Sequence, residues 1–308
     1  MPSQAWLPWE RPQWSEIAQA WTDVHMKAVG LTSLGPLQVV RTRPWAIIAK
    51  VPTDQGLLWF KEAAPVLAFE PALTGFMARH LPDIAPDVVV TEGARMLTFD
   101  AGTKLRRLRQ VDQRKHWETL LPRYAEVQIA LIGHVQRLVA LGTPDQRPSQ
   151  LLATYPRLRG LTSLVGELAE PIQPTLIHQE ITAGNIFVDK GGRIRILDWA
   201  EATASHPFAG LVNTLRDIAW ARRLRPNGRE MIRLRDSHLE PWTQFAPMSR
   251  LNRLFERGCL LGMLCRAATW QRIMGARSRD RKFGRHAAIW MQFFRHAIVH
   301  GVEIGGPV

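Results

Sequence analysis

The sequence lacks the features that mark several classes of protein. Its apolar runs stay short of the ~18 residues that a transmembrane helix requires, so we expect neither a membrane span nor a membrane partner. Its first residues lack the basic and then apolar pattern of a secretory signal peptide, and we therefore expect a cytoplasmic protein. No internal repeat is visible, and the composition of 46% hydrophobic and 22% charged residues excludes collagen, coiled coil and disorder.

Cysteine is scarce, with two residues in a chain of 308. Cys259 and Cys265 lie six positions apart in the apolar segment CLLGMLC. A free cysteine among apolar neighbours behaves as a small buried hydrophobic residue. We therefore expect two core thiols rather than a disulfide or a metal site.

Acidic residues are fewer than basic ones, 27 against 40, which gives a net charge of +13 and raises nucleic acid as a partner. Residues 211–308 hold 18 basic and 7 acidic residues, so +11 of this excess is local. Its densest segments, ARRLRPNGRE and ARSRDRKFGRH, match no nucleic-acid-reading motif. We expect solvated Arg-rich helix faces and no nucleic-acid partner. A basic surface over a substrate entrance is the alternative, and it would favour an anionic or neutral substrate.

The first hundred residues combine strand and helix patterns. Apolar residues at helical spacing predict a helix over 13–29, ended by a glycine, and a second helix is predicted over 67–81. Runs of β-prone residues bounded by turn residues predict strands in LQVVRT, WAIIAKV, LLWFKEA and the two halves of VVVTEGARMLTF. This part of the chain therefore predicts a small antiparallel sheet with one inserted helix.

Long helical patterns dominate from about residue 112 onward, as in residues 116–141, 251–275 and 283–300. One β-hairpin interrupts them in NIFVDKGGRIRILDW. The predicted fold class is α+β with two lobes. Residues 1–99 would form a small sheet lobe, and residues 100–308 a larger, mainly helical lobe.

Polar side chains stand at the ends of the apolar runs around this hairpin. They are His178, Glu180, Asn185 and Asp198. Strand ends and tight loops bring such side chains into a shared cleft rather than into the core. The hairpin sets an amide oxygen of Asn185 beside a carboxylate of Asp198, and both are hard oxygen ligands suited to Mg²⁺.

The pattern His, acid, four residues, Asn, hairpin and Asp-Trp resembles the catalytic loop of the aminoglycoside phosphotransferase and choline kinase family, which shares the protein-kinase fold. Glu180 precedes Asn185 by five residues, the spacing of the protein-kinase loop. The resemblance implies that Asn185 and Asp198 hold Mg²⁺ and that Glu180 orients the acceptor hydroxyl. His178 would hydrogen-bond the loop backbone.

The same resemblance assigns a nucleotide site to the first lobe. Lys61, in the run LLWFKEA, would hold the phosphates of ATP (or GTP), and Glu70 on the following helix would be its ion-pair partner. Glu62 is a rival partner, but it neighbours Lys61 and points to the opposite sheet face. Residues 94–106 resemble the hinge, and the adenine would dock there on backbone groups from Leu97 to Ala101, among them Thr98, Phe99 and Asp100.

Two departures from the family pattern stand out. Glu180 occupies the position of the family's Asp, and the connection between the first two strands, VVRTRPWAII, has no glycine-rich lid. Asp198-Trp199-Ala200 replaces the protein-kinase motif Asp-Phe-Gly, so a small-molecule acceptor fits better than a peptide.

Two functions follow from these observations. One is transfer of the γ-phosphoryl group of ATP to a hydroxyl of a small molecule, which could be an antibiotic, a sugar or an amino alcohol. The other is a nucleotide-binding module weakened in catalysis by the Glu180 change. The sequence does not choose between antibiotic resistance, biosynthesis and catabolism, and it gives no oligomeric state.

Overall fold

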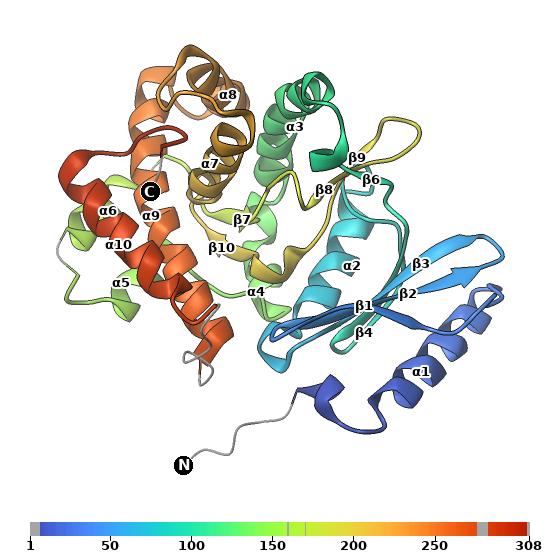
Figure 1. Ribbon diagram of the computed structural model, residues 1–308. Coiled ribbons are helices and arrows are strands. Elements are labelled where there is room, and N and C mark those ends of the chain that lie inside the picture. Colours follow the sequence, from blue (N-terminus) through green and yellow to red (C-terminus); the bar gives the residue numbers. More distant parts are fainter. Residues whose placement is uncertain (1–6, 159, 170, 276–282, 307–308) are drawn as a thin grey trace. The chain divides into compact units, whose positions relative to one another are not determined.

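The computed structural model describes residues 7–158, 160–169, 171–275 and 283–306 (Figure 1). The chain divides into two compact units, Met1–Gly102 with Val188–Ala200, and Thr103–Phe187 with Glu201–Val308. The fold is α+β, with an antiparallel sheet in the N-terminal region and a helical C-terminal part, as the sequence predicts. The assignment of nucleotide binding to one lobe and acceptor binding to the other stays a prediction.

A five-stranded antiparallel sheet forms the framework of the first unit. Its order is β1 (Gln38–Arg43), β2 (Ala46–Thr53), β3 (Gly56–Ala63), β5 (Arg95–Phe99) and β4 (Val88–Glu92). Turns at Pro44-Trp45 and at Asp54-Gln55 join the first three strands. Lys61 of β3 faces Ile48 of β2 and Met96 of β5, so its backbone is fixed from both sides.

Two helices pack against this sheet. The predicted first helix is α1 (Trp14–Ala28), and Trp14, Ala18 and Met26 share a buried cluster with strand residues such as Leu58 (Figure 1). The other helix is α2 (Glu70–His80), which packs against β4. It begins later than the predicted residue 67, because residues 65–67 form a 3₁₀ turn, η2, and Pro71 suits the first turn of a helix. This later start makes Glu70 the first residue of α2.

The predicted hairpin has its turn between β8 (Ile186–Val188) and β9 (Ile194–Ile196). Asp189 Oδ1 accepts hydrogen bonds from the amides of Gly191 and Arg193. Arg195 is 3% exposed and donates to the carbonyl groups of Pro82 and Ala85 and to the carboxylate of Asp87. The bonds of Arg195 hold β9 within the first unit and fix the chain that leads to Asp198.

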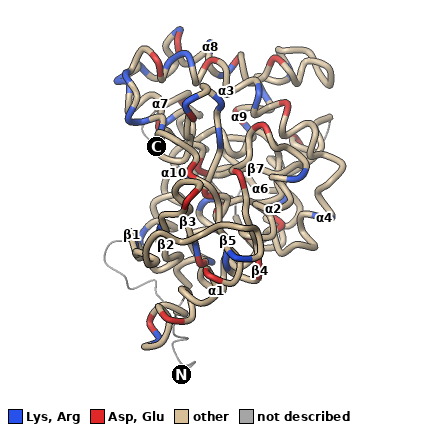
Figure 2. Tube along the Cα trace, turned by 90° about the vertical axis from the view of Figure 1, so that its right-hand side faces the viewer, with Lys and Arg blue, Asp and Glu red and all other residues tan. Residues whose placement is uncertain are grey.

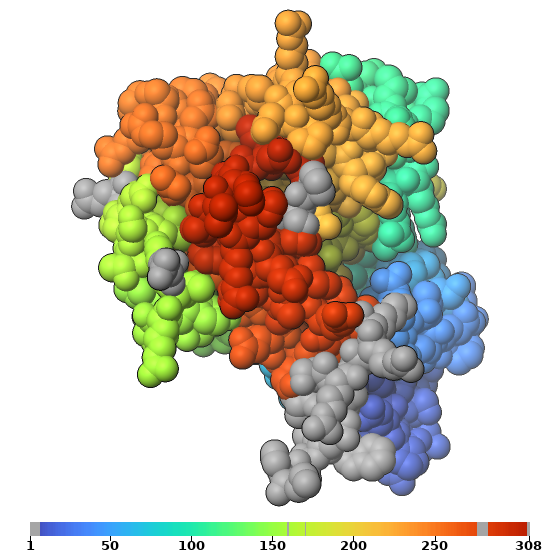
Figure 3. Space-filling model, turned by 60° about the vertical axis from the view of Figure 1, so that its left-hand side comes forward, coloured from blue at the N-terminus to red at the C-terminus, as the bar shows by residue number. Residues whose placement is uncertain are grey.

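The second unit is built mainly from helices. They are α3 (Gln110–Ala130), α4 (Val135–Ala140), α5 (Pro148–Thr154), α6 (Leu161–Glu167), α7 (Leu211–Arg222), α8 (Arg229–Leu239), α9 (Met248–Met274) and α10 (His286–His300). Figure 3 shows α10 lying over α9 on one face of this unit. The sequence missed the two-stranded antiparallel sheet of β7 (Thr175–Ile177) and β10 (Thr203–Ser205). Strands of three residues are too short to give an alternation pattern.

Helix α9 is the most buried helix of the second unit. Cys259 and Cys265 are free and buried on it, which confirms the prediction of core thiols. Gly258 lets the chain at Phe208 approach closely, because a Cβ there would lie 2.7 Å from Cβ of Phe208. No helix within the described ranges is long and apolar enough to cross a membrane.

The basic excess lies partly on α7 and α8 (Figure 2). Several of these arginines have acidic neighbours. Arg222 lies 2.7 Å from Glu230, and Arg233 lies 2.5 Å from Glu118. These faces are therefore partly neutralised. Most of the segment ARSRDRKFGRH, residues 276–282, lies outside the described residues.

Candidate active site

Lys61 lies at the centre of a cluster of charges in the first unit. Its Nζ is 2.6 Å from Oε1 of Glu70 and 2.6 Å from Oδ1 of Asp198. The sequence predicted the pair with Glu70, and the structure places it there. The rival Glu62 accepts a hydrogen bond from Trp14 Nε1 at 2.6 Å and pairs with Arg95 at 3.2 Å, away from Lys61.

Burial and charge shape the ionisation of this cluster. Burial alone would lower the pKa of Lys61, but the carboxylates of Asp198 and Glu70 raise it above its ordinary value. Lys61 therefore stays protonated. Burial raises the pKa of Glu70 to about 7, although Lys61 opposes this shift. A protonated Lys61 whose partners are carboxylates is suited to hold an anion such as a phosphate group.

Asp198 follows β9 in a backbone conformation that few residues adopt, with a φ of 67°. Asp tolerates the left-handed region better than most residues. The next side chain, Trp199, is buried and donates from Nε1 to the carbonyl of Ile196 at 3.1 Å. The chain is thus anchored on both sides of Asp198, which directs its carboxylate to Lys61.

The predicted hinge residues lie at the end of β5 and just beyond it. Leu97 and Thr98 are buried, whereas Asp100 is exposed and accepts a hydrogen bond from Trp59 Nε1 at 2.7 Å. The amide of Phe99 donates to the carbonyl of Asp87, and the amide of Asp100 donates to the carbonyl of Leu57. These two amides are engaged within the first unit, and docking of an adenine on the hinge stays a prediction.

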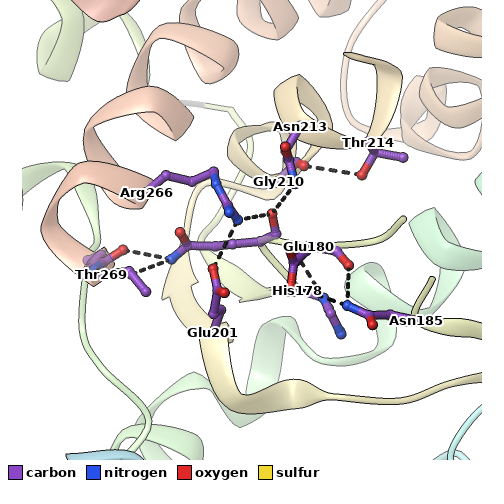
Figure 4. Close-up of polar contacts among 11 residues, drawn as sticks. His178, Glu180, Asn185, Glu201, Gly210, Asn213, Thr214, Arg266 and Thr269 are labelled. Carbon is purple, nitrogen blue, oxygen red and sulfur yellow. Dashed lines mark hydrogen bonds and ion pairs between the residues drawn. The ribbon is translucent and has the colours of Figure 1, made fainter. Parts of the chain in front are cut away.

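The predicted catalytic loop lies in the second unit and follows β7 (Figure 4). His178 is fully buried, and its Nδ1 accepts a hydrogen bond from the amide of Glu180 at 3.1 Å, which is the predicted structural role. Asn185 donates from Nδ2 to the carbonyl of Glu180 at 3.1 Å and to its Oε2 at 3.3 Å. The carboxylate of Glu180 and the amide of Asn185 therefore lie side by side.

The sequence did not reveal the side chains that anchor this loop. The carbonyl of Gln179 accepts hydrogen bonds from Arg266 Nη1 at 2.6 Å and from Asn213 Nδ2 at 3.3 Å. Asp217 accepts a hydrogen bond from the amide of Ala183 at 3.0 Å. One signal was available, since Arg266 interrupts an apolar helical run, and a charged residue on a core face needs a buried partner.

Asn185 and Asp198 have the donor chemistry that Mg²⁺ prefers, a neutral oxygen and a carboxylate. Because Nδ2 of Asn185 is turned toward Glu180, its Oδ1 is the atom that could meet a cation. Asp198 belongs to the first unit and Asn185 to the second. Among the described residues there is no group of three or more His, Cys, Asp or Glu side chains that could hold a metal ion.

Comparison with known proteins identifies relatives of the chain. Residues 57–247 match the model of the phosphotransferase enzyme family. No curated protein sequence is similar enough to count as a match.

Solved structures show the same fold. An ethanolamine kinase of Plasmodium vivax is similar with a TM-score of 0.62 and 13% identity, covering 92% of this chain and 89% of that one. A choline kinase of Streptococcus pneumoniae gives a TM-score of 0.58 and 9% identity, over 92% and 99%. A macrolide 2′-phosphotransferase of type I is similar with a TM-score of 0.56 and 15% identity, covering 87% of this chain and 94% of that one.

Proposed function

The chain belongs to the phosphotransferase enzyme family, and from that premise we propose that it transfers the γ-phosphoryl group of ATP to a hydroxyl of a small molecule. The observation that carries this proposal is the cluster of Lys61, Glu70 and Asp198, in which one ammonium lies 2.6 Å from two carboxylates. Within this cluster the side chain of Glu70 is fully buried and that of Lys61 is 12% exposed. Burial of charge is costly, and groups with shifted pKa values gather at functional sites.

Each member of the cluster has a role in this proposal. Lys61 binds the nucleotide phosphates, and Glu70 holds Lys61 in place. Asp198 and Asn185 hold Mg²⁺, which supplies charge that stabilises the transferring phosphoryl group. GTP is the alternative nucleotide, because the proposal is carried by the phosphate-binding cluster and not by recognition of the base.

The acceptor side of the reaction rests on the loop of the second unit. Glu180 orients the acceptor hydroxyl and accepts its proton as the new phosphorus–oxygen bond forms. Carboxylates of Glu are competent in this role. Asn185 supports it, because its Nδ2 lies 3.3 Å from Oε2 of Glu180 and keeps the carboxylate in a defined orientation.

The acceptor belongs to the small hydroxylated molecules. An antibiotic, a sugar or an amino alcohol would each supply the alcohol group. Proteins with this fold include an ethanolamine kinase and a macrolide phosphotransferase, which are named for acceptors of this kind. A role in antibiotic resistance is one form of this proposal, with biosynthesis and catabolism as the others.

A nucleotide-binding module without transfer is the second candidate, favoured by the presence of Glu180 where the family has Asp. Both candidates predict nucleotide binding, and only the first predicts turnover. Hydrolysis of ATP distinguishes them, because water replaces the acceptor while the true acceptor is unknown.

The test compares ATP hydrolysis by the wild type, Asp198→Asn and Asp23→Asn, each with and without Mg²⁺. Asp23 is exposed on α1 and serves as the matched control. We expect Mg²⁺-dependent turnover in the wild type and in Asp23→Asn, and its loss in Asp198→Asn. Undiminished turnover in Asp198→Asn would overturn the assignment of Asp198. The absence of turnover from the wild type would favour the binding module.

A further inference from the structure

The residue before Glu180 is fixed by two helices of the second unit. The carbonyl of Gln179 accepts hydrogen bonds from Arg266 of α9 at 2.6 Å and from Asn213 of α7 at 3.3 Å (Figure 4). The side chain of Gln179 is 1% exposed, and its Nε2 donates to Gln146 and Thr269, both at 3.0 Å. Gln179 is therefore held through both its main chain and its side chain.

Arg266 is a buried cation whose partners lie in or near the loop. It is 4% exposed, its Nη1 lies 3.1 Å from Oε2 of Glu201, and its Cζ lies 4.9 Å from the centre of the Trp290 ring. Burial of a guanidinium is costly unless it is paired and hydrogen-bonded. Glu201 offsets the charge, and the bond to the Gln179 carbonyl is charge-assisted and therefore stronger than a neutral one.

The far end of the loop is anchored as well. Ala183 donates its amide to the carboxylate of Asp217 at 3.0 Å and accepts a hydrogen bond at its carbonyl from the amide of Arg106 at 2.9 Å. Two residues beyond Ala183, Asn185 donates from Nδ2 to the carbonyl and to the carboxylate of Glu180, which lies between the anchors. The loop is thus held at both ends and has little freedom to shift.

From these contacts we propose that Arg266, together with Asn213, is a positioning residue. The two side chains, which we call the clamp, hold the loop at a distance from the acceptor that the longer side chain of a glutamate at position 180 spans and that of an aspartate does not. The inference rests on the proposed function. An aspartate there would withdraw the carboxylate by ~1.5 Å, the length of one carbon–carbon bond. Because the loop is fixed, it does not move to compensate, and a misplacement of about 1 Å can cost on the order of 10²-fold in rate.

The test is a double-mutant cycle of Glu180→Asp and Arg266→Lys, with hydrolysis of Mg·ATP as the readout. We expect Glu180→Asp alone to lower kcat about 10²-fold. Arg266→Lys should lower kcat about tenfold with the KM for ATP within about twofold of the wild type, because lysine lacks the planar fork of arginine. In the Arg266→Lys background, Glu180→Asp should cost less than about tenfold, since the loosened loop can approach. Losses that simply multiply, or a gain of activity in Glu180→Asp, would overturn the proposal.

Arg257→Lys is the matched control. Arg257 lies on the same helix and pairs with Glu167 at 2.6 Å, but it is exposed. Its effect should multiply with that of Glu180→Asp without coupling. Asn213→Ala removes the second donor and leaves the charge pair intact, so it replaces Arg266→Lys in the cycle if that variant does not fold. Asn213→Ala must show coupling of the same sign with Glu180→Asp. Effects of the two substitutions on kcat that simply multiply would contradict the proposed positioning role.

Hydrogen exchange separates this inference from the proposed function. The amides of Glu180 and Ala183 should exchange at least about fivefold faster in Arg266→Lys than in the wild type, and at the wild-type rate in Arg257→Lys. If the wild type shows no turnover, the proposed function fails. Hydrogen exchange at the two amides still shows whether Arg266 holds the loop in place. Unchanged exchange at both amides in Arg266→Lys would overturn the clamp.

Discussion

The Nζ of Lys61 lies 2.6 Å from Oδ1 of Asp198, a carboxylate 137 positions further along the chain. Lys61 stands on β3, and Asp198 stands on the segment that Arg195 attaches to the same unit. The two groups meet because residues Val188–Ala200 belong to the first unit, although the helical segments separate them from β3 in the sequence. Because Lys61 contacts both carboxylates of the cluster, we expect its substitution to lower the activity strongly.

Substitution of Lys61 by Met should lower kcat/KM for ATP by on the order of 10²-fold, since removal of one charge-stabilising donor typically costs this much. Lys50→Met on the neighbouring strand β2 is the control and should stay near the wild-type value. Steady-state hydrolysis of Mg·ATP measures both. Equal losses in the two variants would mean that Lys61 acts only as a strand residue.

The two glutamates near Lys61 should separate function from stability. Glu70→Gln should lower kcat/KM about tenfold and change the free energy of unfolding little at pH 7, because burial already raises the pKa of Glu70 to about 7. Glu62→Gln should keep the activity and lose about 1–3 kcal/mol of stability, because Glu62 accepts from Trp14 and pairs with Arg95. Kinetics and urea unfolding of both variants provide the measurement. The opposite pattern would exchange the roles of the two carboxylates.

Stability should fall with acid through two buried histidines of the second unit. Burial lowers the pKa of His206 to about 3 and that of His238 to about 4. A histidine in the unfolded chain has a pKa of ~6.5. Below that pH the unfolded chain binds protons that the folded chain does not, so the free energy of unfolding decreases as the pH falls. Each histidine should account for about 2 kcal/mol between pH 6.5 and pH 5.

Urea unfolding of the wild type, His238→Gln and His300→Gln at pH 7.5, 6.5 and 5.0 measures this effect. His238→Gln should remove its own share of the decrease. His300 is exposed at the end of α10, and His300→Gln should retain the wild-type dependence. A wild-type slope in His238→Gln would show that the buried imidazole does not cause the acid sensitivity.

Gly102 should resist substitution. Its φ of +96° lies in the left-handed region, and a Cβ there would lie 2.8 Å from Cα of Asp189. Gly102→Ala should therefore lower the free energy of unfolding by about 2 kcal/mol or more. Gly133→Ala is the control, because nothing lies within 4 Å of a Cβ at that position. Thermal or urea unfolding measures the difference, and equal stability of the two variants would contradict this explanation.

The residues that the sequence could predict are those whose environment is local. Lys61 sits in a strong β pattern and Glu70 lies nine residues later on a predicted helix, and the resemblance to the phosphotransferase family supplied their pairing, which the structure shows at 2.6 Å. The strands β7 and β10 are too short for a pattern to emerge. Helix α2 begins at Glu70 rather than at the predicted residue 67, because Pro65 and Pro71 restrict where the first turn of the helix can form.

The contacts that anchor the catalytic loop could not be predicted from the sequence, for a different reason. Arg266 reaches the carbonyl of Gln179 across 87 positions, and Asn213 reaches it across 34. A backbone carbonyl leaves no trace in a sequence, so neither contact could be predicted from residue types. Only the position of Arg266 within an apolar helix indicated that a buried partner must exist.

The most direct test of a working phosphotransferase is the consumption of Mg·ATP by the wild type and Glu180→Gln, with nucleotide affinity measured in parallel by calorimetry. Glutamine retains the shape of the side chain and removes the carboxylate that would accept the hydroxyl proton. We predict equal affinities, turnover in the wild type, and a rate at least about 10²-fold lower in Glu180→Gln. Equal rates in the two proteins, or nucleotide binding without turnover in the wild type, would contradict the account.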